Sequence, residues 1–465
     1  MQPQKLSQST LSALRGIVGQ GNVLTSDEHR LCYAYDAQRL ECVPDAIVRP
    51  ADTAQIAAVL RLANENAFPV IPRGAGTGLS GGSVAAAGGV VLDVCRLDRI
   101  VQIDETNMLL TAQPGVVTAK LVSAAEKLGL LYPPDPGSIN ACTIGGNVAE
   151  NSGGLRAVKY GVTGDYLKAL EVVSPLGEVY RTGARTVKSV AGYNVTSLLC
   201  GSEGTLGVLT EITVKLIPIP RFRRSLLAVF DTVRGATDAV VAIMTCGVLP
   251  ATLEMMDGMT IRHVEQANHI GLPVEAEAIL LIEVDGYSDA GVAEEAEIVR
   301  AALAKSEASE MKTADNPADR ERLWEARRSA IPALARARPT TMLEDVTVPV
   351  TALSEMTLFI QQMAREHSVS VATFGHAGDG NLHPTFLADD RDEDEIARVK
   401  QATAEIFEKA IALGGTVSGE HGIGMTKTRF LPMETGPATI EVMRSIKRAM
   451  DPNNILNPGK VFFED

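Results

Sequence analysis

The residue types best suited to catalysis in this sequence are histidines and a glutamate in two glycine-rich segments. His376 and His383 flank the turn "AGDGN" in "TFGHAGDGNLHPTF", and Glu420 and His421 are adjacent in "GGTVSGEHGIGMTK". Two imidazoles and one carboxylate form a three-ligand set that leaves coordination positions open, as a catalytic metal site requires. The chain has 7 histidines, and three of them lie in these segments. For each one, the alternative is a buried core histidine with ordinary polar partners.

Short strands are expected to position these side chains. The segments "SVSVATFGH" and "LHPTFLA" are predicted strands, so "AGDGN" becomes the turn of a hairpin across which His376 and His383 converge. Glu420 and His421 would point to opposite faces of a regular strand, but the glycines on either side of the pair permit a bend. We expect Glu420 to ligate a metal and His421 to serve as a base. Each ligating imidazole also needs an acceptor for its other nitrogen, which the sequence does not identify.

Length and charge narrow the class of protein. At 465 residues the chain exceeds one ordinary domain, so two domains are predicted. Lys and Arg number 43 against 57 Asp and Glu, which gives a net charge of −14. This balance argues against nucleic acid as a partner, because phosphate binding requires a positive surface. An anionic substrate would need a local cationic pocket.

Cysteine spacing and hydropathy bear on redox centres and location. The 6 cysteines occur singly, at Cys32, Cys42, Cys95, Cys142, Cys200 and Cys246. Without a CxxC pair, iron–sulfur and cysteine-rich zinc sites are not expected. The N-terminal "MQPQKLSQSTLSALRGIVG" lacks the features of a signal peptide, and no window of about 18 uncharged apolar residues occurs. We therefore expect a cytoplasmic protein with reduced thiols and no transmembrane segment.

Strand and helix signals divide the chain into two parts. In the first, "PDAIVRP", "FPVIPRG", "GVVLDV" and "LLTAQPG" are predicted strands, and residues 53–66 a helix with Thr53 as N-cap. Residues 213–223 carry two prolines and are predicted to leave this domain. Strand and helix then alternate in "SLLAVFD", "ATDAVVAIMTCG" and "AILLIEVDG". This alternation predicts an α+β domain with an antiparallel sheet.

Glycine-rich regions in the first half predict a ligand surface made of backbone. In "PRGAGTGLSGGS", residues 72–83, Gly76, Gly78 and Gly81 match GxGxxG literally. A Rossmann site needs a helix that starts in this loop, whereas "AAAGGVVLDV" leads to another strand. We therefore expect a loop whose amides approach an anion closely. Residues 133–183 and 189–216 carry further glycines, and the three regions together suit a long, flat, phosphate-bearing ligand.

These glycine regions and the C-terminal "MDPNNILNPGKVF" resemble a known family from about residue 40 to residue 462. The family is the FAD-dependent D-2-hydroxyacid dehydrogenases, which include the glycolate oxidase FAD subunit, D-lactate dehydrogenase and D-2-hydroxyglutarate dehydrogenase. The resemblance implies an α+β fold with a vanillyl-alcohol-oxidase (PCMH) type FAD-binding domain. We expect this domain at residues 1–220, a substrate or cap domain with the metal site at 221–425, and a C-terminal segment at 426–465 that returns to the FAD domain.

The resemblance also implies which residues bind FAD. In the family the first glycine loop holds the pyrophosphate, which corresponds to Arg73, Gly74, Ala75, Gly76, Thr77 and Gly78. The second region lines the flavin and corresponds to Pro134, Asp135, Ser138, Gly145, Gly146, Asn151, Gly154, Gly161, Glu203 and Gly207. Covalent relatives attach FAD through a His or Cys in these segments. The segments contain no His, so non-covalent FAD is expected, with Cys142 as the candidate for a tether.

The family's activity implies roles for the histidines and the glutamate. It uses the equivalents of His376, His383 and Glu420 as a metal site, which favours metal ligation over core histidines. We expect a divalent ion, zinc ahead of manganese. The implied reaction oxidises a 2-hydroxy acid to the 2-oxo acid: His421 takes the hydroxyl proton and the C2 hydride moves to flavin N5.

The substrate carboxylate needs a cation in this acidic protein. By the family's W-x-x-R element, Arg327, three residues after Trp324, is the expected clamp, while most neighbouring arginines would face water on a helix. Relatives selective for a second carboxylate carry extra polar groups after this arginine and beside the second histidine. Ile331 and Thr385 stand at these positions and favour glycolate or D-lactate over D-2-hydroxyglutarate. A transferase of the alkyl-glycerone-phosphate synthase type and a non-catalytic subunit are the other interpretations.

Reduced flavin must pass its electrons to an acceptor. The chain shows neither a nicotinamide site nor the cysteine spacing of an iron–sulfur cluster. Relatives use a companion iron–sulfur subunit, electron-transferring flavoprotein, a cytochrome or a quinone. We therefore expect an acceptor protein or a quinone as partner, and any peripheral membrane association would come through partner subunits.

Overall fold

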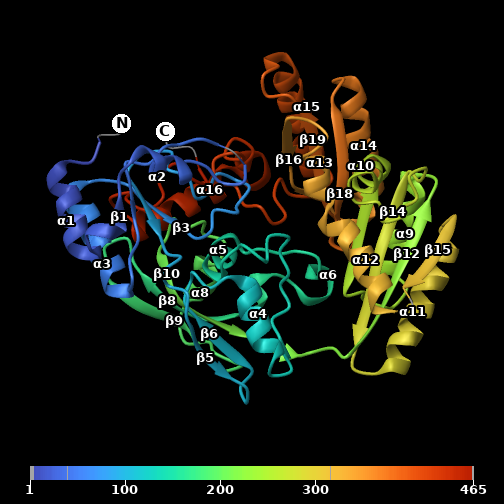
Figure 1. Cartoon of the computed structure of the whole chain (residues 1–465), viewed down its shortest axis with the longest axis horizontal. Coiled ribbons are helices and arrows are strands. Elements are labelled where there is room, and N and C mark those ends of the chain that lie inside the picture. Colours follow the sequence, from blue (N-terminus) through green and yellow to red (C-terminus); the bar gives the residue numbers. More distant parts are fainter. Residues whose placement is uncertain (1–4, 39, 315, 463–465) are drawn as a thin grey trace. The chain divides into compact units, whose positions relative to one another are not determined.

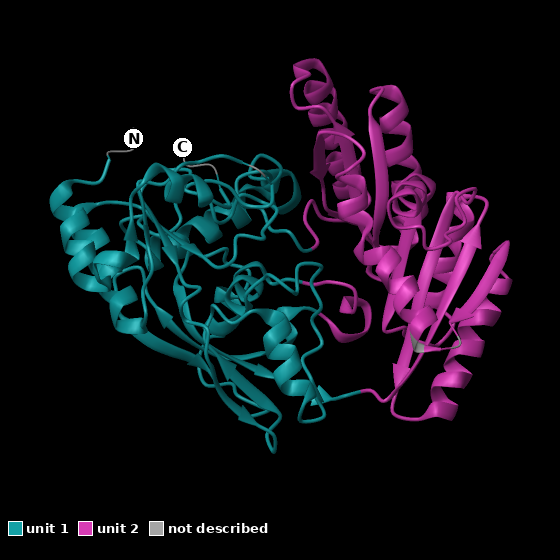
Figure 2. Cartoon of the chain, in the orientation of Figure 1, with its two compact units in different colours: residues 1–152, 162–219, 420–465 teal, residues 153–161, 220–419 magenta. Residues whose placement is uncertain are grey.

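The chain forms two compact units, shown in different colours in Figure 2. The computed structural model describes residues 5–38, 40–314 and 316–462. Unit 1 contains residues 1–152, 162–219 and 420–465, and unit 2 contains residues 153–161 and 220–419. The long excursion into unit 2 therefore begins within the proline-rich segment 213–223.

Unit 1 combines two larger sheets and a two-stranded pair with flanking helices (Figure 1). Its strands are β1 (Val23–Leu24), β2 (Ala46–Val48), β3 (Val70–Arg73), β4 (Val90–Asp93), β5 (Ile100–Asp104), β6 (Leu109–Ala112), β7 (Leu130–Leu131), β8 (Leu167–Val173), β9 (Val179–Gly183), β10 (Val208–Lys215) and β11 (Ile217–Pro218). Its helices are α1 (Gln8–Val18), α2 (Asp27–Cys32), α3 (Thr53–Asn66), α4 (Thr118–Glu126), α5 (Ile144–Glu150), α7 (Thr163–Tyr166), α8 (Val195–Leu199) and α16 (Leu431–Met450), with the 3₁₀ turn η1 (Gln20–Asn22).

The two sheets of unit 1 differ in strand direction. The first has the order β1-β2-β4-β3, and its strands β2, β4 and β3 are parallel. The second is antiparallel in the order β5-β6-β10-β8-β9, and β7 pairs with β11. Leu14 of α1 and Ile56 and Leu60 of α3 are fully buried in one core cluster with Val70 and Val90. Burial of such side chains contributes about 1.5–3 kcal/mol each, so this cluster fixes the strand that leads into the first glycine loop.

The C-terminal segment adds to the edge of the first sheet. Leu456 forms a parallel bridge with Val70 of β3. The N–H of Val70 donates to the carbonyl of Ile455 at 2.8 Å, and the N–H of Asn457 donates to the carbonyl of Val70 at 2.9 Å. Lys460 Nζ donates to the carbonyls of Gly81 and Val84. Residues 455–460 thus hold the first glycine loop from the side.

The N-cap predicted for α3 was wrong by one residue. Asp52, with extended backbone, accepts the N–H of Gln55 at 2.8 Å, while Thr53 is already helical. The Thr53 hydroxyl donates to Glu171 instead. Asp and Thr are both common N-caps. When the two are adjacent, the N-cap is the one whose backbone is still extended where the helix begins.

Unit 2 is a single antiparallel sheet with helices around it (Figure 1). Its strands are β12 (Phe222–Phe230), β13 (Thr252–Asp257), β14 (Ala278–Gly286), β15 (Glu310–Ala314), β16 (Thr340–Leu343), β17 (Val346–Thr347), β18 (Ser370–His376) and β19 (Asn381–Ala388). Its helices are α6 (Ala157–Tyr160), α9 (Val233–Met244), α10 (Gly258–Asn268), α11 (Asp289–Ala304), α12 (Pro317–Arg328), α13 (Ala330–Leu334), α14 (Leu353–Glu366) and α15 (Glu393–Ala412), with η2 (Val350–Ala352) and η3 (Ala377–Asp379). The order is β15-β12-β14-β13-β18-β19-β16, with β17 beside β19, and it confirms the predicted α+β unit.

Strand register places four ionisable residues of this sheet on one face. Thr252 of β13 lies opposite Glu283 of β14, so Glu254, two residues further along β13, shares that face. Met255 lies opposite Gly375, and continuing this register sets Glu254 opposite His376 of β18. His376 in turn lies opposite Asn381, and Phe374 lies opposite His383. Neighbouring strands β14, β13, β18 and β19 therefore present Glu283, Glu254, His376 and His383 to the same side.

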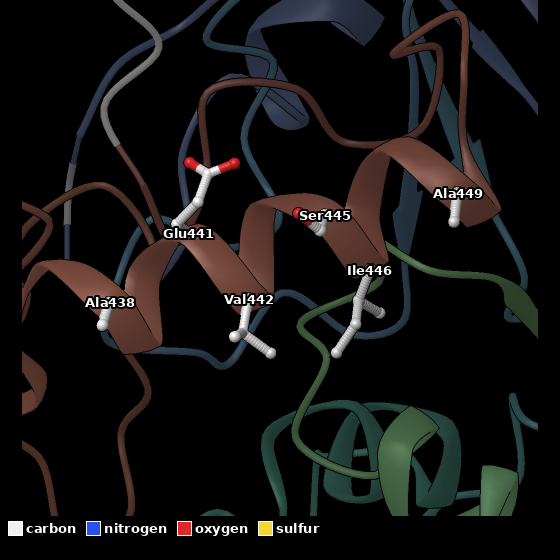
Figure 3. A pocket seen from close by; sticks show the side chains of 6 residues that line it. All are labelled: Ala438, Glu441, Val442, Ser445, Ile446 and Ala449. Atoms are coloured by element: carbon white, nitrogen blue, oxygen red, sulfur yellow. The ribbon is translucent and has the colours of Figure 1, made fainter.

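The longest helices, α15 and α16, have 20 residues each. α16 is interrupted at Gly436, and its exposed side bears a shallow hollow of about 590 Å³ lined by Ala438, Glu441, Val442, Ser445, Ile446 and Ala449 (Figure 3). None of the predicted site residues lines this hollow. Among the described helices, none has the length and apolar character needed to cross a membrane.

Candidate active site

A tight hairpin brings the two predicted histidine ligands together. His376 ends β18 and His383 lies in β19, with ring centroids 5.2 Å apart and planes at 89°. Both residues are buried, at 6% and 3% exposure. Gly380 in the turn has φ +78°, and a Cβ there would lie 2.0 Å from the carbonyl oxygen of Val348. Only glycine fits this turn, which explains the residue type in "AGDGN".

Glu254 of β13 joins one of these histidines to the predicted substrate clamp. Its Oε1 accepts Nδ1–H of His376 at 2.7 Å, and its Oε2 accepts Nε–H of Arg327 at 2.6 Å. The Glu254 side chain is 1% exposed, so both interactions are removed from water. Losing one partner of such a buried pair typically costs about 3–5 kcal/mol.

The W-x-x-R element docks α12 on the polar face of the sheet. Residues three apart lie on the same side of a helix, so Trp324 and Arg327 face the sheet together. Trp324 Nε1 donates to Oε2 of Glu283 at 3.1 Å, while Arg327 reaches Glu254 one strand away. The Arg327 guanidinium also lies 4.7 Å from the ring centroid of Phe374, in a cation–π arrangement. Arg327 is thus a buried residue, unlike the water-facing arginines expected around it.

A second carboxylate lies beside His383. Asp345 is fully buried, and its Oδ1 is 3.8 Å from Nδ1 of His383, beyond hydrogen-bond range. Asn381 Nδ2 donates to Asp345 Oδ1 at 2.6 Å, and Ser418 Oγ donates to Oδ2 at 3.1 Å. Gly419 packs so closely that a Cβ there would lie 2.7 Å from Asn381 Nδ2. Ser418 and Gly419, the last residues of unit 2, therefore pack beside the same histidine hairpin.

Glu420 and His421 begin the return of the chain to unit 1. His421 Nε2 is 3.8 Å from Glu420 Oε1, so the adjacent side chains point the same way. The backbone is neither helical nor a strand here, and Gly422 has φ +82°. Glu203 anchors the next two residues of the chain, because its carboxylate accepts the N–H groups of Ile423 at 2.8 Å and Gly424 at 2.7 Å. The predicted bend next to the glycines is confirmed.

The first glycine loop follows β3 in unit 1, at Gly74 to Gly82. Arg73, the first residue of the predicted pyrophosphate loop, donates to the backbone carbonyls of Tyr35 at 2.8 Å and Ser83 at 3.3 Å. A Cβ on Gly76 would lie 2.2 Å from Arg73 NH2, so the buried guanidinium supports the loop from beneath. Burial lowers the pKa of Arg73. Its side chain is therefore a structural element of the loop, and the loop amides are left as the predicted phosphate donors.

The other predicted flavin residues lie in four segments. Pro134, Asp135 and Ser138 precede α5, Gly145 and Gly146 lie within it, and Asn151 is its C-cap; Glu203 and Gly207 precede β10. These eight belong to unit 1, whereas Gly154 and Gly161 lie in the segment 153–161 of unit 2. A Cβ on Gly145 would lie 2.6 Å from Pro114, so glycine here lets α5 approach the neighbouring chain. Glu203 turns its carboxylate toward the return segment instead of toward solvent.

Buried polar atoms beside this loop fit a bound cofactor. Within the described residues, Ser80 Oγ and Glu150 Oε2 are buried without a hydrogen-bond partner. A Cβ on Gly82 would lie 3.0 Å from Glu150 Oε1 and 3.5 Å from Ser80 Oγ, which places both at the loop. Burial and the nearby charge of Glu203 raise the pKa of Glu150 well above its usual range. Buried polar groups normally find partners, so a ligand with hydrogen-bonding atoms suits this position.

Cys142, the candidate for a covalent tether, is turned into the protein. It is 3% exposed, and its Sγ lies 3.5 Å from Thr118 Oγ1 and 3.7 Å from Asn147 Oδ1. All six cysteines are free thiols. Thr118 and Asn147 also hydrogen-bond to each other, so the thiol belongs to a packed polar cluster.

Comparison with known proteins identifies the two halves of the chain. Residues 44–183 match the model of the FAD binding domain, and residues 219–461 match that of the FAD linked oxidases, C-terminal domain. The chain belongs to the FAD-linked oxidase family. It is therefore an FAD-linked oxidoreductase, as the glycine regions and the C-terminal motif implied.

Full-length relatives of this FAD-linked oxidase carry names of short hydroxy-acid enzymes. Glycolate oxidase subunit GlcD of Bacillus subtilis is 47% identical over 450 residues, which cover 97% of this chain and 96% of the relative. D-lactate dehydrogenase of Anaerostipes hadrus is 37% identical over 455 residues, 95% of each chain. Among solved structures, p-cresol methylhydroxylase superposes with a TM-score of 0.84 at 18% identity, over 99% of this chain and 98% of that one. This likeness confirms the predicted vanillyl-alcohol-oxidase (PCMH) type fold.

Sequence reasoning missed several residues of this FAD-linked oxidase that the structure brings to the site. Glu254 and Asp345 are buried carboxylates within or just after apolar strands. A carboxylate in an otherwise apolar strand signals a buried partner, because an unpaired buried charge is costly. Ser80 and Glu150 were missed in the flavin region, because the interpretation of that region relied on its glycines.

Proposed function

We propose that this FAD-linked oxidase oxidises a short D-2-hydroxy acid, glycolate or D-lactate, to the corresponding 2-oxo acid. The observation that supports this most is the buried arginine clamp set directly beside an imidazole pair. Arg327 and His376 share the carboxylate of Glu254, and His383 lies 5.2 Å from His376 between ring centroids. The names of the glycolate oxidase and D-lactate dehydrogenase relatives point to the same substrates.

Arg327 would bind the substrate carboxylate. Its Nε is engaged by Glu254, and no described residue accepts from its two terminal nitrogens. These two nitrogens form the planar fork that binds a carboxylate through two parallel hydrogen bonds. A buried, partly neutralised arginine gives the local cation that an anionic substrate needs in a chain of net charge −14.

His376, His383 and Glu420 would hold a divalent metal, zinc ahead of manganese. The chemistry of the set fits, because two imidazoles and one carboxylate suit either ion and leave positions open. Ser418 Oγ donates to Asp345 and Gly419 packs against Asn381, so the end of unit 2 lies beside the hairpin. A trans peptide bond keeps the Cα of Glu420 about 3.8 Å from that of Gly419. Chain connectivity therefore supports Glu420 as the third ligand.

The reaction needs a proton and a hydride to leave the substrate. When bound, FAD supplies the two-electron acceptor and the metal supplies a Lewis acid that makes the substrate hydroxyl more acidic. Arg327 orients the substrate by its carboxylate, so that the hydroxyl and C2 hydrogen take fixed positions. His421 accepts the hydroxyl proton on a ring nitrogen as the C2 hydride departs, and the C–O bond becomes the carbonyl of the 2-oxo acid.

One residue after the clamp in the sequence and one beside the second histidine favour a short substrate over D-2-hydroxyglutarate. Ile331 in α13 is 43% exposed and offers no polar group. Thr385 is fully buried, and its hydroxyl donates to the carbonyl of His383 at 3.1 Å. Neither position supplies a cation for a second carboxylate. D-2-hydroxyglutarate is the alternative substrate. A transferase is less favoured, because the likeness to alkyldihydroxyacetonephosphate synthase, at 19% identity and a TM-score of 0.77, concerns the fold alone.

We further propose that FAD is bound without a covalent bond and that its electrons pass to a partner protein or a quinone. The burial of Cys142 in its polar cluster supports the first point. The Bacillus subtilis relative is named as a subunit of glycolate oxidase, which supports the second point. Purified protein should then reduce an artificial dye or a quinone analogue, react slowly with oxygen and give no NADH from NAD.

The decisive experiment is a substrate panel with anaerobic flavin spectroscopy. Glycolate and D-lactate should bleach the flavin absorbance and support dye reduction, whereas L-lactate and D-2-hydroxyglutarate should act poorly. His421→Ala should lower kcat by about 10²–10⁴-fold while retaining FAD, because general bases contribute rate factors of that size. Bleaching by D-2-hydroxyglutarate alone would move the assignment to the alternative substrate. No bleaching by any 2-hydroxy acid would reject the dehydrogenase assignment.

A further inference from the structure

We propose that Glu254 is a positioning residue that sets the substrate clamp and a metal ligand relative to each other. The inference deepens the proposed function and rests on it, because it assumes that Arg327 binds the carboxylate and His376 binds the metal. Glu254 itself would touch neither substrate nor metal. Its role would be to hold two functional side chains, from α12 and β18, at one fixed separation.

Both carboxylate oxygens of Glu254 accept a hydrogen bond. Oε1 takes Nδ1 of His376 at 2.7 Å and Oε2 takes Nε of Arg327 at 2.6 Å, so each oxygen has its own charged or polar donor. The carboxylate is 1% exposed. Phe374 on β18 closes another side, with its ring centroid 4.7 Å from the Arg327 guanidinium. Because the carboxylate is shielded from water and accepts one hydrogen bond from each partner, both partners have little freedom to move.

The contact with Glu254 also selects the tautomer of His376. A carboxylate can only accept, so Nδ1 must carry the hydrogen. Nε2 is then the nitrogen with a lone pair, which is the form that ligates a metal. Glu254 thereby performs two functions through one side chain: it turns the imidazole toward ligation and it fixes the arginine fork.

An amide cannot replace this carboxylate. If glutamine turned its oxygen to Arg327, its NH2 would face Nδ1 of His376 and favour the tautomer with hydrogen on Nε2. If it turned its oxygen to His376, its NH2 would oppose the Nε–H of Arg327. Glutamine has nearly the same shape as glutamate, so Glu254→Gln tests the two acceptor oxygens without changing the packing volume.

The chain offers a matched control in Glu283. This carboxylate lies on the same face of the adjacent strand β14, is also buried, and accepts from Trp324 on the same helix α12. It also accepts from Ser225, but no histidine contacts it. Glu283→Gln should weaken the docking of α12 and lower the thermal unfolding midpoint, without changing the tautomer of His376.

The first measurement is metal affinity, with zinc as the probe. Chelator-stripped, FAD-loaded protein is titrated with zinc in competition with a chromophoric chelator. Glu254→Gln should raise the zinc dissociation constant by about 10–100-fold, as loss of a partner behind a metal ligand typically does. Glu283→Gln should stay within about twofold of the parent, and Glu254→Asp, which keeps two acceptor oxygens, should recover part of the affinity.

The second measurement separates KM from kcat for D-lactate and glycolate at saturating zinc. Because the clamp loses its acceptor, Glu254→Gln should raise KM by about tenfold even when metal is restored. A purely structural role would lower folded yield and FAD content instead, leaving KM and zinc affinity of the folded fraction unchanged. That result would overturn the inference.

The outcomes distinguish this inference from the proposed function. If the parent protein binds no zinc or manganese and oxidises no 2-hydroxy acid, the proposed function fails and the positioning role fails with it. If the parent does both and Glu254→Gln matches it in zinc affinity and KM, only the positioning role fails. If Glu254→Gln does not fold, Glu254→Asp carries the test, and parent-like zinc affinity and KM in that variant would count against a distance-fixing role.

Discussion

At the scale of residues, the site depends on buried charged groups whose partners come from other strands. Glu254, Arg327 and His376 form one hydrogen-bonded set, and Glu283 with Trp324 forms another beside it. Each charge is buried together with an acceptor or donor, which is the condition for a stable polar core. A single change in these groups should therefore lower the stability of the fold, and a change in the set that contains Arg327 and His376 should also alter binding.

Replacing Arg327 by lysine should raise KM for glycolate and D-lactate by at least about tenfold, because the charge stays but the planar fork is lost. Arg328→Lys is the control: Arg328 is exposed and pairs only with Glu321 on the same helix. Steady-state kinetics with a dye acceptor measures both. Equal KM values for the two variants would contradict the assignment of Arg327 as the clamp.

A buried aspartate should make stability depend on pH between about 4 and 6. Asp257 caps α10 and accepts the N–H of Thr373, and burial raises its pKa to about 6. An exposed aspartate titrates near about 3.9, so the folded state binds this proton more tightly. The resulting stabilisation is full below about pH 4 and is lost as pH rises through about 6, a change of about 3 kcal/mol.

Asp257→Asn removes this titration. The free energy of unfolding of the parent relative to the variant should therefore fall by about 3 kcal/mol from pH 4 to pH 7, as measured by denaturant unfolding at four pH values. A pH-independent difference between parent and variant would show that Asp257 titrates at an ordinary value.

At the scale of elements, one short segment belongs to a different unit from the residues that precede and follow it in the sequence. Residues 153–161 cluster with unit 2, while the chain on both sides belongs to unit 1. Lys159 Nζ contacts Asp285 Oδ1 at 2.6 Å, and Tyr160 Oη donates to both Asp285 oxygens at 2.9 and 2.8 Å. Asp285 lies in β14, so a strand of the larger sheet anchors a segment that contains two predicted flavin glycines, Gly154 and Gly161.

Asp285→Asn should weaken FAD binding by about tenfold, because it removes a charge-assisted contact that holds this segment. The exposed Asp289, which pairs with Arg224, provides the control, and Asp289→Asn should bind FAD like the parent. Fluorescence titration of deflavinated protein with FAD measures the dissociation constants. Parent-like FAD affinity in Asp285→Asn would remove this segment from the flavin site.

At the scale of the whole molecule, the residues predicted to bind the two cofactors lie mostly in different units. The first glycine loop and most of the second glycine region belong to unit 1, and the histidine hairpin belongs to unit 2. The Gly419–Glu420 peptide bond joins the end of unit 2 to the return segment. Because the two sets of residues lie mostly in different units, we expect that one cofactor can be removed without the other. The flavin should remain when the metal is taken away.

Chelation of the purified enzyme should abolish oxidation of D-lactate while the flavin absorbance stays with the protein, and added zinc or manganese should restore turnover. Acid precipitation should then release FAD into the supernatant. Full activity in protein that elemental analysis shows to be free of transition metal would contradict the metal assignment. Flavin retained in the acid pellet would instead indicate a covalent bond.

Much of this protein was determined by local sequence. The glycine loops, the hairpin around "AGDGN" and the W-x-x-R spacing are short-range patterns, and short-range patterns depend on backbone sterics and helix or strand periodicity alone. The hairpin pattern was sufficient for the convergence of His376 and His383. The FAD-binding fold and the assignment of Arg327 followed from the family resemblance that the glycine loops and the W-x-x-R spacing carry.

The tertiary structure alone decided how these patterns combine. Glu254 and His376 are 122 positions apart, and Arg327 is 73 positions from Glu254, so only the order of strands in the sheet makes them neighbours. The same holds for Arg73, whose side chain turns beneath its own loop toward Tyr35. A long-range pair depends on which strands meet and in which register, and local propensity carries no information about either.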